Sequence, residues 1–237
     1  YQAAAQIAII LAAILSAFNM ILMPMIADQF HKKDMGQLEE LYRVNTKWGI
    51  YCIAPLVLVI LFAAEDVMRV TFGAAFVGGA TTLLILTVGQ FVNIATGATG
   101  TILIMTGHQT AWFRLSLVVL VANLALNLTL VPRWGMIGAA IATATTVGGL
   151  FTISLLIVKH SLDLWPYDRR YLKGIAAGLA TAVLLLGVRL LGLSSLANLL
   201  LTATVAVAGF FGLLILLGLD PEDRDFIALL MRRVRAR

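Results

Sequence analysis

Long uncharged stretches, separated by short charged ones, form the main pattern of this chain. An α-helix needs about 20 apolar residues to cross the hydrocarbon core of a membrane. The uncharged stretches have about that length, and no alternation of apolar and polar residues with a period of two recurs along them. They cover residues 1–27, 48–64, 70–113, 115–132, 134–158, 174–188 and 190–219.

We predict an all-α integral membrane protein with seven transmembrane helices. The stretch 70–113 would reach about 66 Å as one helix, which is too long for one span. Gly73, Gly78 and Gly79 near its start indicate a loop or re-entrant piece at 70–79. The predicted helices cover about 3–25, 47–64, 80–106, 113–131, 136–158, 172–192 and 196–218, so that residues 1–219 form one transmembrane unit.

Lysine and arginine are divided unequally between the two sides that seven spans define. Fourteen of the 17 fall on one side. Because positively charged loops stay in the cytoplasm, this side is predicted to be cytoplasmic, with the C-terminus inside and Tyr1 outside. The fourteen lie within 32–47, at Arg114, within 159–173 and within 224–237; the other three are Arg69, Arg133 and Arg189.

The composition agrees with a membrane protein and excludes other classes. Of the 237 residues, 61% are hydrophobic and 12% are charged, whereas a soluble domain is about 45–50% apolar and about 25% charged. Soluble, disordered, collagen-like and disulfide-framework proteins are thereby excluded. The net charge of +5 lies in loops and a tail, so it indicates membrane orientation and no nucleic-acid partner. Cys52 is the single cysteine, which excludes an intrachain disulfide.

Two segments have the pattern of helices at the membrane surface. Residues 34–47 begin with Asp34 as a predicted N-cap and Gln37 three positions later, which is the spacing of a capping box. Residues 220–237 begin with Asp220 and Pro221 and continue with apolar residues at helical spacing among arginines. This tail is predicted to be a basic amphipathic helix on the cytoplasmic surface, or a solvated tail that only sets the topology.

No catalytic centre is visible in the sequence. No predicted span carries an acidic residue at its centre, and His31, His108 and His160 lie far apart without the spacing of metal ligands. Phosphate-binding and nucleophile motifs are also missing, so we predict that the protein is not an enzyme. Polar residues within the spans, such as Gln90 and Asn93, either pack helices together or line a path for an ion or substrate.

An ordered set of short segments resembles the C-terminal half of bacterial polysaccharide flippases. These are the O-antigen or Wzx-type exporters of the multidrug/oligosaccharidyl-lipid/polysaccharide (MOP) superfamily. The resemblance covers nearly all of residues 1–160, and the last two spans match only in hydropathy. It is carried by Pro24, Gln37–Tyr42, Leu84–Asn93, Gly97, Gly100, Thr106–His108, Asn123–Asn127, Val131–Gly135 and Gly138–Thr143.

The resemblance implies a fold, a cargo and a location. Members of this family have fourteen helices in two lobes around a central cavity and work by alternating access. They move an undecaprenyl-pyrophosphate-linked oligosaccharide across the bacterial cytoplasmic (inner) membrane for lipopolysaccharide and other polysaccharide biosynthesis. This chain would be helices eight to fourteen. Its expected partners are the missing N-terminal lobe, the lipid-linked oligosaccharide and membrane lipids, and the chain alone would not transport.

The resemblance also implies a candidate cation site. Sodium-coupled relatives bind the ion with two polar residues four positions apart on the eleventh helix, and with a threonine and a backbone carbonyl on the twelfth. The matching residues are Asn123, Asn127, Thr143 and the carbonyl of Ala139. The second residue of the pair is an aspartate in those relatives and Asn127 here, which should weaken sodium binding. Otherwise the two asparagines are structural and no cofactor is expected.

A substrate cavity is expected beside the first span. There Gln2, Gln6 and Ser16 share a face whose amides and hydroxyl suit sugar hydroxyls, although helix packing would explain them equally. The candidates for binding the pyrophosphate are cations on the cytoplasmic side, which membrane topology alone would also explain. These cations are Arg43, Lys47 and Arg114.

Other functions stay open at this point. A multidrug or cation antiporter and a lipid II flippase belong to the same superfamily. An integral-membrane enzyme of envelope synthesis would be a different class, and it would need a large external loop or ionisable residues inside the membrane. A scaffold that no longer transports is the fourth possibility.

Overall fold

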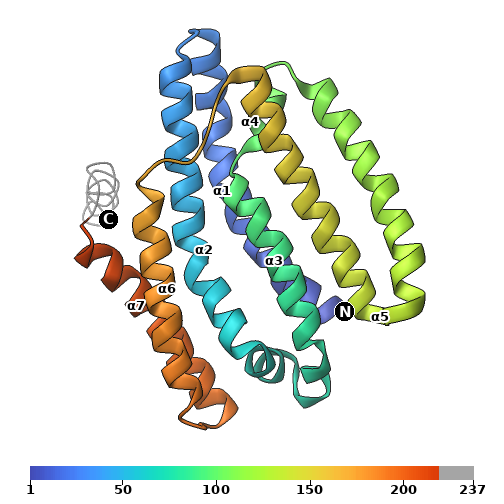
Figure 1. Ribbon diagram of the computed structural model, residues 1–237, viewed down its shortest axis with the longest axis vertical. Coiled ribbons are helices and arrows are strands. Elements are labelled where there is room, and N and C mark those ends of the chain that lie inside the picture. Colours follow the sequence, from blue (N-terminus) through green and yellow to red (C-terminus); the bar gives the residue numbers. More distant parts are fainter. Residues whose placement is uncertain (219–237) are drawn as a thin grey trace, which may run out of the picture.

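Every regular element of the described chain is helical. The computed structural model describes residues 1–218, and the predicted tail at 220–237 lies outside them. The all-helical class is thus confirmed for these residues. The elements are α1 (Gln2–His31), α2 (Met35–Phe72), the 3₁₀ helix η1 (Ala74–Gly79), α3 (Ala80–Thr96), α4 (Thr99–Met105), α5 (Gln109–Leu162), α6 (Tyr171–Arg189) and α7 (Ser195–Leu216) (Figure 1).

The helices form a flat bundle with α1, α2 and α3 at its centre. Figure 1 shows α5 folded on one side of this centre and the pair α6–α7 on the other. A non-helical connector, residues 163–170, crosses from α5 to α6 at the end of the bundle where α1 turns into α2. We call this the connector end, and the opposite end, which holds η1, the far end.

Five of the described helices are long and apolar enough to cross a membrane, or six if the bent α1 is one span. The bend in α1 separates Gln2–Ala17 from Leu22–His31 by 41°. Pro24 lies just after it, and a proline cannot complete the hydrogen bond to the carbonyl four residues earlier. These helices give a multi-pass membrane protein, while the count of seven spans stays a prediction.

The second predicted span and the segment before it form one helix. Residues 34–47 and 47–64 were expected to be separate, but α2 (Met35–Phe72) runs through both because no helix-breaking residue stands between them, and it kinks later, at Ala63, where φ is −134° and ψ is 32°. Asp34 caps this helix as predicted, and its side chain accepts a hydrogen bond from the backbone N–H of Gln37. The loop expected at 70–79 is the end of α2 followed by η1.

Helix α5 is a hairpin of two arms. Its path reverses at Gly135, whose φ of 53° and ψ of −128° are not helical, and Figure 1 shows the two arms running side by side. Pro132 stands just before the reversal, where it removes one helical hydrogen bond. The predicted spans 113–131 and 136–158 lie within these two arms.

The third predicted span, 80–106, is divided in the structure. Helix α3 ends at Thr96 and α4 starts at Thr99, with Gly97 between them at φ 71° and ψ −147°. Only glycine adopts this conformation without strain. A Cβ atom at Gly97 would also collide with the hydroxyl of Thr46 on α2. Gly97 therefore allows the helix to break at this point and also allows α2 to pack closely against the break.

We predict that Gly97→Ala destabilises the protein. The backbone strain alone should cost about 1–3 kcal/mol, and the collision with Thr46 adds to it. The matched control is Gly149→Ala in α5, where an added Cβ meets nothing within 4 Å. Thermal unfolding in detergent should show a clear loss for the first variant and little change for the second. Equal melting temperatures would contradict this account of the break.

Candidate functional site: an apolar groove and two polar clusters

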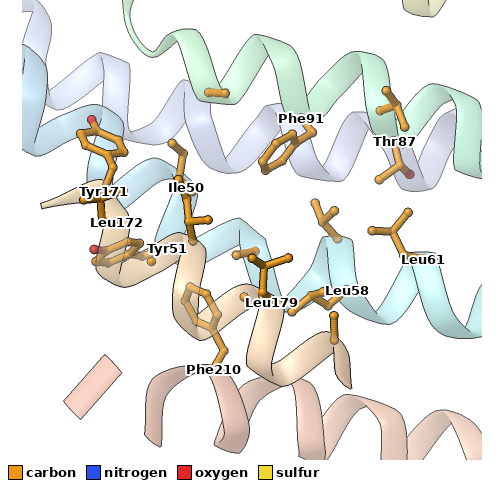
Figure 2. Close-up of a pocket in the computed structure, with 18 of the residues that line it drawn as sticks. Ile50, Tyr51, Leu58, Leu61, Thr87, Phe91, Tyr171, Leu172, Leu179 and Phe210 are labelled. Atoms are coloured by element: carbon orange, nitrogen blue, oxygen red, sulfur yellow. The ribbon is translucent and has the colours of Figure 1, made fainter. Parts of the chain in front are cut away.

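A groove of about 790 Å³ lies along α2, between α3 on one side and α6 with α7 on the other. Its lining is almost wholly apolar, as Figure 2 shows. The stretch of α2 from Ile50 to Leu61 follows it for about 17 Å. Side chains that line it include Ile50, Tyr51, Leu58 and Leu61 from α2, Thr87 and Phe91 from α3, Leu172 and Leu179 from α6, and Phe210 from α7.

The groove opens sideways through the surface of the bundle. Several of its lining side chains are also exposed on the outside, among them Leu61, Val88, Leu172 and Leu179. In Figure 2, Tyr51 and Tyr171 lie at one end of the groove, and Leu61 and Thr87 lie toward the other. The tyrosine end is the connector end, where Tyr167 and Asp168 of the connector complete the lining.

A cluster of ion pairs surrounds the tyrosine end of the groove. Arg170 pairs with Glu40 at 2.5 Å and with Asp168 at 3.2 Å, and Arg43 pairs with Glu39 at 2.6 Å. The pair of Arg170 with Glu40 ties the connector to α2, whereas each of the other two pairs lies within one of these segments.

Lys47 belongs to the same region of the bundle. Its side chain is only 2% exposed, and its ammonium group lies 6.0 Å from the centre of the Tyr51 ring. It lines a small cavity together with Arg43, Arg170 and Asp168. The region thus holds three cations, Arg43, Lys47 and Arg170, and three carboxylates, Glu39, Glu40 and Asp168. The cluster is therefore balanced in charge.

The six residues predicted for a substrate cavity do not come together. Gln2, Gln6 and Ser16 are exposed on α1, and the Ser16 hydroxyl donates to the carbonyl of Ala12 in its own helix. Arg43 and Lys47 lie in the ion-pair region just described. Arg114 is exposed near the start of α5. None of these residues lines the groove.

The asparagine pair predicted for a cation site links the two arms of α5. Asn123 Nδ2 donates to Thr146 Oγ1 at 2.9 Å, and Asn127 Nδ2 donates to the backbone and side-chain oxygens of Asn123 at 2.8 and 3.1 Å. Thr146 Oγ1 donates in turn to the Ala142 carbonyl at 2.7 Å. These three side chains form a chain of hydrogen bonds across the hairpin.

The threonine predicted for that site has another partner. The Thr143 hydroxyl lies 3.1 Å from the Tyr1 hydroxyl, and it is Thr146, three residues further on, that the structure joins to the asparagines. Ala139 is partly buried on the same arm as these threonines. Thr146 lies one helical turn after Thr143 on the same face, and helical spacing in the sequence could have indicated it, whereas the resemblance implied only Thr143.

The arrangement of the pair does not fit a sodium ion. Such an ion needs oxygen ligands, but in this structure both oxygens of Asn123 accept hydrogen bonds from the Asn127 amide nitrogen. No carboxylate takes part in this network. The amide and hydroxyl groups bond to one another and to backbone carbonyls of α5, and the sodium site remains a prediction of the resemblance.

Two curated relatives match the chain, and no model of a known protein family does. It is 24% identical over 195 residues to the "Probable low-salt glycan biosynthesis flippase Agl15" of Haloferax volcanii, a match that spans 81% of this chain and 40% of the relative. It is 24% identical over 126 residues to the "Capsular polysaccharide biosynthesis protein CapF" of Staphylococcus aureus, across 53% of this chain and 32% of the relative.

These names confirm the resemblance to polysaccharide flippase-type proteins. They favour a transporter over an enzyme and support a role in polysaccharide biosynthesis. The chain spans less than half the length of either relative.

We predict that Thr146→Val weakens the α5 hairpin. Valine keeps the shape of threonine but leaves the Asn123 amide without its acceptor, and hydrogen bonds between helices in membranes contribute about 0.6–1.7 kcal/mol. Thr129→Val is the matched control, because the Thr129 hydroxyl bonds only to carbonyls of its own helix. Thermal unfolding in detergent should separate the two variants. Equal decreases in melting temperature for Thr146→Val and Thr129→Val would show that the hairpin does not depend on this network.

We predict that the melting temperature of the unchanged chain is the same in sodium chloride and in choline chloride. A bound sodium ion would stabilise the folded state and raise the melting temperature. Asn127→Asp adds the missing carboxylate and should introduce a dependence on sodium concentration. The measurement is thermal unfolding at constant ionic strength with the two cations exchanged. A rise with sodium in the unchanged chain would show that the asparagines bind the ion after all.

Proposed function

We propose that the chain is the C-terminal lobe of a flippase for a lipid-linked oligosaccharide, and that its groove holds the hydrocarbon chain of that lipid. The observation that carries the proposal is an apolar groove that opens sideways from a bundle of membrane-spanning helices. The names of the two relatives support the same class of cargo. In this proposal the lipid is an undecaprenyl pyrophosphate, and the protein lies in the bacterial inner membrane.

The groove suits a hydrocarbon chain for reasons of shape. In a bilayer a lipid chain is already surrounded by hydrocarbon, so burial in a protein gains little from the hydrophobic effect, and the gain comes from close packing. A groove about 17 Å long that is lined by branched and aromatic side chains can pack against one such chain along its length. Selectivity then depends on shape, and affinity depends mostly on the polar head group.

The sugar would follow a different path from the lipid chain. Glycan hydroxyls need hydrogen-bonding partners, and the apolar lining of the groove offers few. The α1 face with Gln2, Gln6 and Ser16 remains our proposal for the sugar side, where it would meet the other lobe. The ion pairs around Arg43 and Lys47 are balanced within the chain, which leaves the exposed Arg114 as the better candidate of the three for the pyrophosphate.

The connector end is proposed to face the cytoplasm. The α1–α2 turn, the start of α5 and the connector all lie there, and they carry most of the lysine and arginine residues of the described loops. A lipid whose head group starts in the cytoplasmic leaflet would then have its chain beside the tyrosine end of the groove. Tyrosines are frequent at this membrane–water boundary.

A multidrug antiporter is the less favoured alternative. Asp168 is the carboxylate that reaches the groove, but it pairs with Arg170 at the groove's end. A charge already neutralised in this way is poorly placed to bind a cationic drug or to carry a proton.

We predict that Leu179→Trp reduces the binding of a polyprenyl phosphate, because the larger ring fills part of the groove. Leu186→Trp is the control. It lies seven residues further along nearly the same face of α6, is 54% exposed where Leu179 is 66% exposed, and does not line the groove. Native mass spectrometry of the chain in lipid nanodiscs measures the bound polyprenyl phosphate against phosphatidylglycerol.

The first variant should retain several-fold less polyprenyl phosphate than the control. In the full-length protein it should also lower glycan export per folded molecule. If both variants bind the lipid as the unchanged chain does, the groove is not its site.

A further inference from the structure

The break between α3 and α4 leaves backbone carbonyls without helical partners. The last carbonyls of any helix have no N–H group to accept from, and a carbonyl that the protein buries away from water needs another donor within the protein. Here the affected carbonyls lie at the end of α3, directly before Gly97. Breaks of this kind are tolerated when other groups of the protein donate to them.

Two tyrosines supply the missing donors from two directions. The Tyr42 hydroxyl of α2 donates to the carbonyl of Thr96 at 2.7 Å, and the Tyr167 hydroxyl of the connector donates to the carbonyl of Ala95 at 2.9 Å. Tyr42 is buried in the bundle core beside Leu38 and Ile102. Tyr167 is only partly buried. Both bonds thus join a tyrosine hydroxyl to a backbone carbonyl, but the Tyr42 bond lies in the core and the Tyr167 side chain is partly exposed.

The Tyr167 bond belongs to the wall of the groove. Both Tyr167 and Ala95 line the groove at its connector end, together with Phe91 one turn earlier on α3. A hydrocarbon chain that fills this end must contact the Tyr167 ring. A tyrosine is protonated at neutral pH and burial raises the pKa of Tyr167 further, so its hydroxyl keeps its role as a donor.

The connector on either side of Tyr167 is firmly attached. Arg43 Nε donates to the Trp165 carbonyl at 3.2 Å, and Arg170 pairs with Glu40. The Tyr171 hydroxyl donates to the Arg43 carbonyl at 3.0 Å. Because the backbone is held on both sides of Tyr167, the side chain can rotate while the connector stays in place.

We propose that Tyr167 senses whether the groove is filled. Hydrocarbon at the connector end displaces its hydroxyl from the Ala95 carbonyl and loosens the α3–α4 break, while Tyr42 holds the break in both states. This inference rests on the proposed lipid-binding role of the groove. A buried carbonyl without a donor is costly, so the loss of the bond favours another arrangement of the break and of α4, which packs against α5.

The test is hydrogen–deuterium exchange of the amides at 96–106, in lipid nanodiscs with and without a polyprenyl phosphate. In the unchanged chain the lipid should raise the exchange rate. Tyr167→Phe removes only the hydroxyl, so it should raise the rate without lipid by about fivefold, the effect of one lost hydrogen bond. It should also abolish the response to lipid.

Tyr42→Phe is the matched control, since it removes a hydroxyl from the neighbouring carbonyl. It should raise the basal exchange but leave the response to lipid in place. Lipid bound to each variant is measured in parallel by native mass spectrometry, and melting temperatures show that each is folded.

The outcomes separate the sensor from the groove. If the lipid binds and exchange at 96–106 does not change, Tyr167 is not a sensor and the groove assignment stands. If Tyr167→Phe responds to lipid as the unchanged chain does, the sensor is likewise overturned. If no polyprenyl phosphate binds to the unchanged chain, the groove assignment fails and the sensor fails with it.

Discussion

A helix that breaks inside a packed bundle must find partners for its free backbone groups within the protein, because the apolar side chains around it offer none. The region around Gly97 depends on this constraint. Gly97 permits the break, and its lack of a side chain leaves room for Thr46 of α2. Tyr42 and Tyr167 donate to the two carbonyls before Gly97. The connector must therefore cross the bundle at this level. That crossing in turn closes one end of the groove.

Charge balance imposes a second constraint at the same end. Partly buried charges are more stable when they are paired and hydrogen-bonded, and the partly buried cations Arg43 and Arg170 each have a carboxylate partner. The cluster consequently acts as a fixed anchor for the connector. An anchored connector is what allows a single side chain, Tyr167, to move without unfolding its surroundings. It also explains why cations on the cytoplasmic side need not be ligands for a phosphate.

The sequence predicted the helical class and several details of it, but not the groove. Gaps between charges located most helices, and Asp34 was recognised as a cap because capping depends on residues only three positions apart. The break at Gly97 was not predicted, since it is stabilised by tyrosines that lie 54 and 72 positions from their acceptors. The groove was missed for the same reason, as its walls come from four helices. For the polar pair, helical spacing identified Asn123 and Asn127, but only the folded hairpin shows that Thr146 completes the network.

Helix α3 connects the groove to the α5 hairpin. One of its faces, with Thr87, Phe91 and Ala95, lines the groove. The opposite face packs so closely on the second arm of α5 that a Cβ at Gly89 would lie 2.7 Å from Ala144 Cα. Packed interfaces of this kind shift between discrete arrangements instead of deforming gradually. Any movement of α3 would therefore either displace the arm of α5 that carries Thr146 or slide along it. In both cases the hydrogen-bond network that joins the two arms lies next to the contact that moves, so a groove on one side of the lobe is mechanically linked to the hairpin on the other.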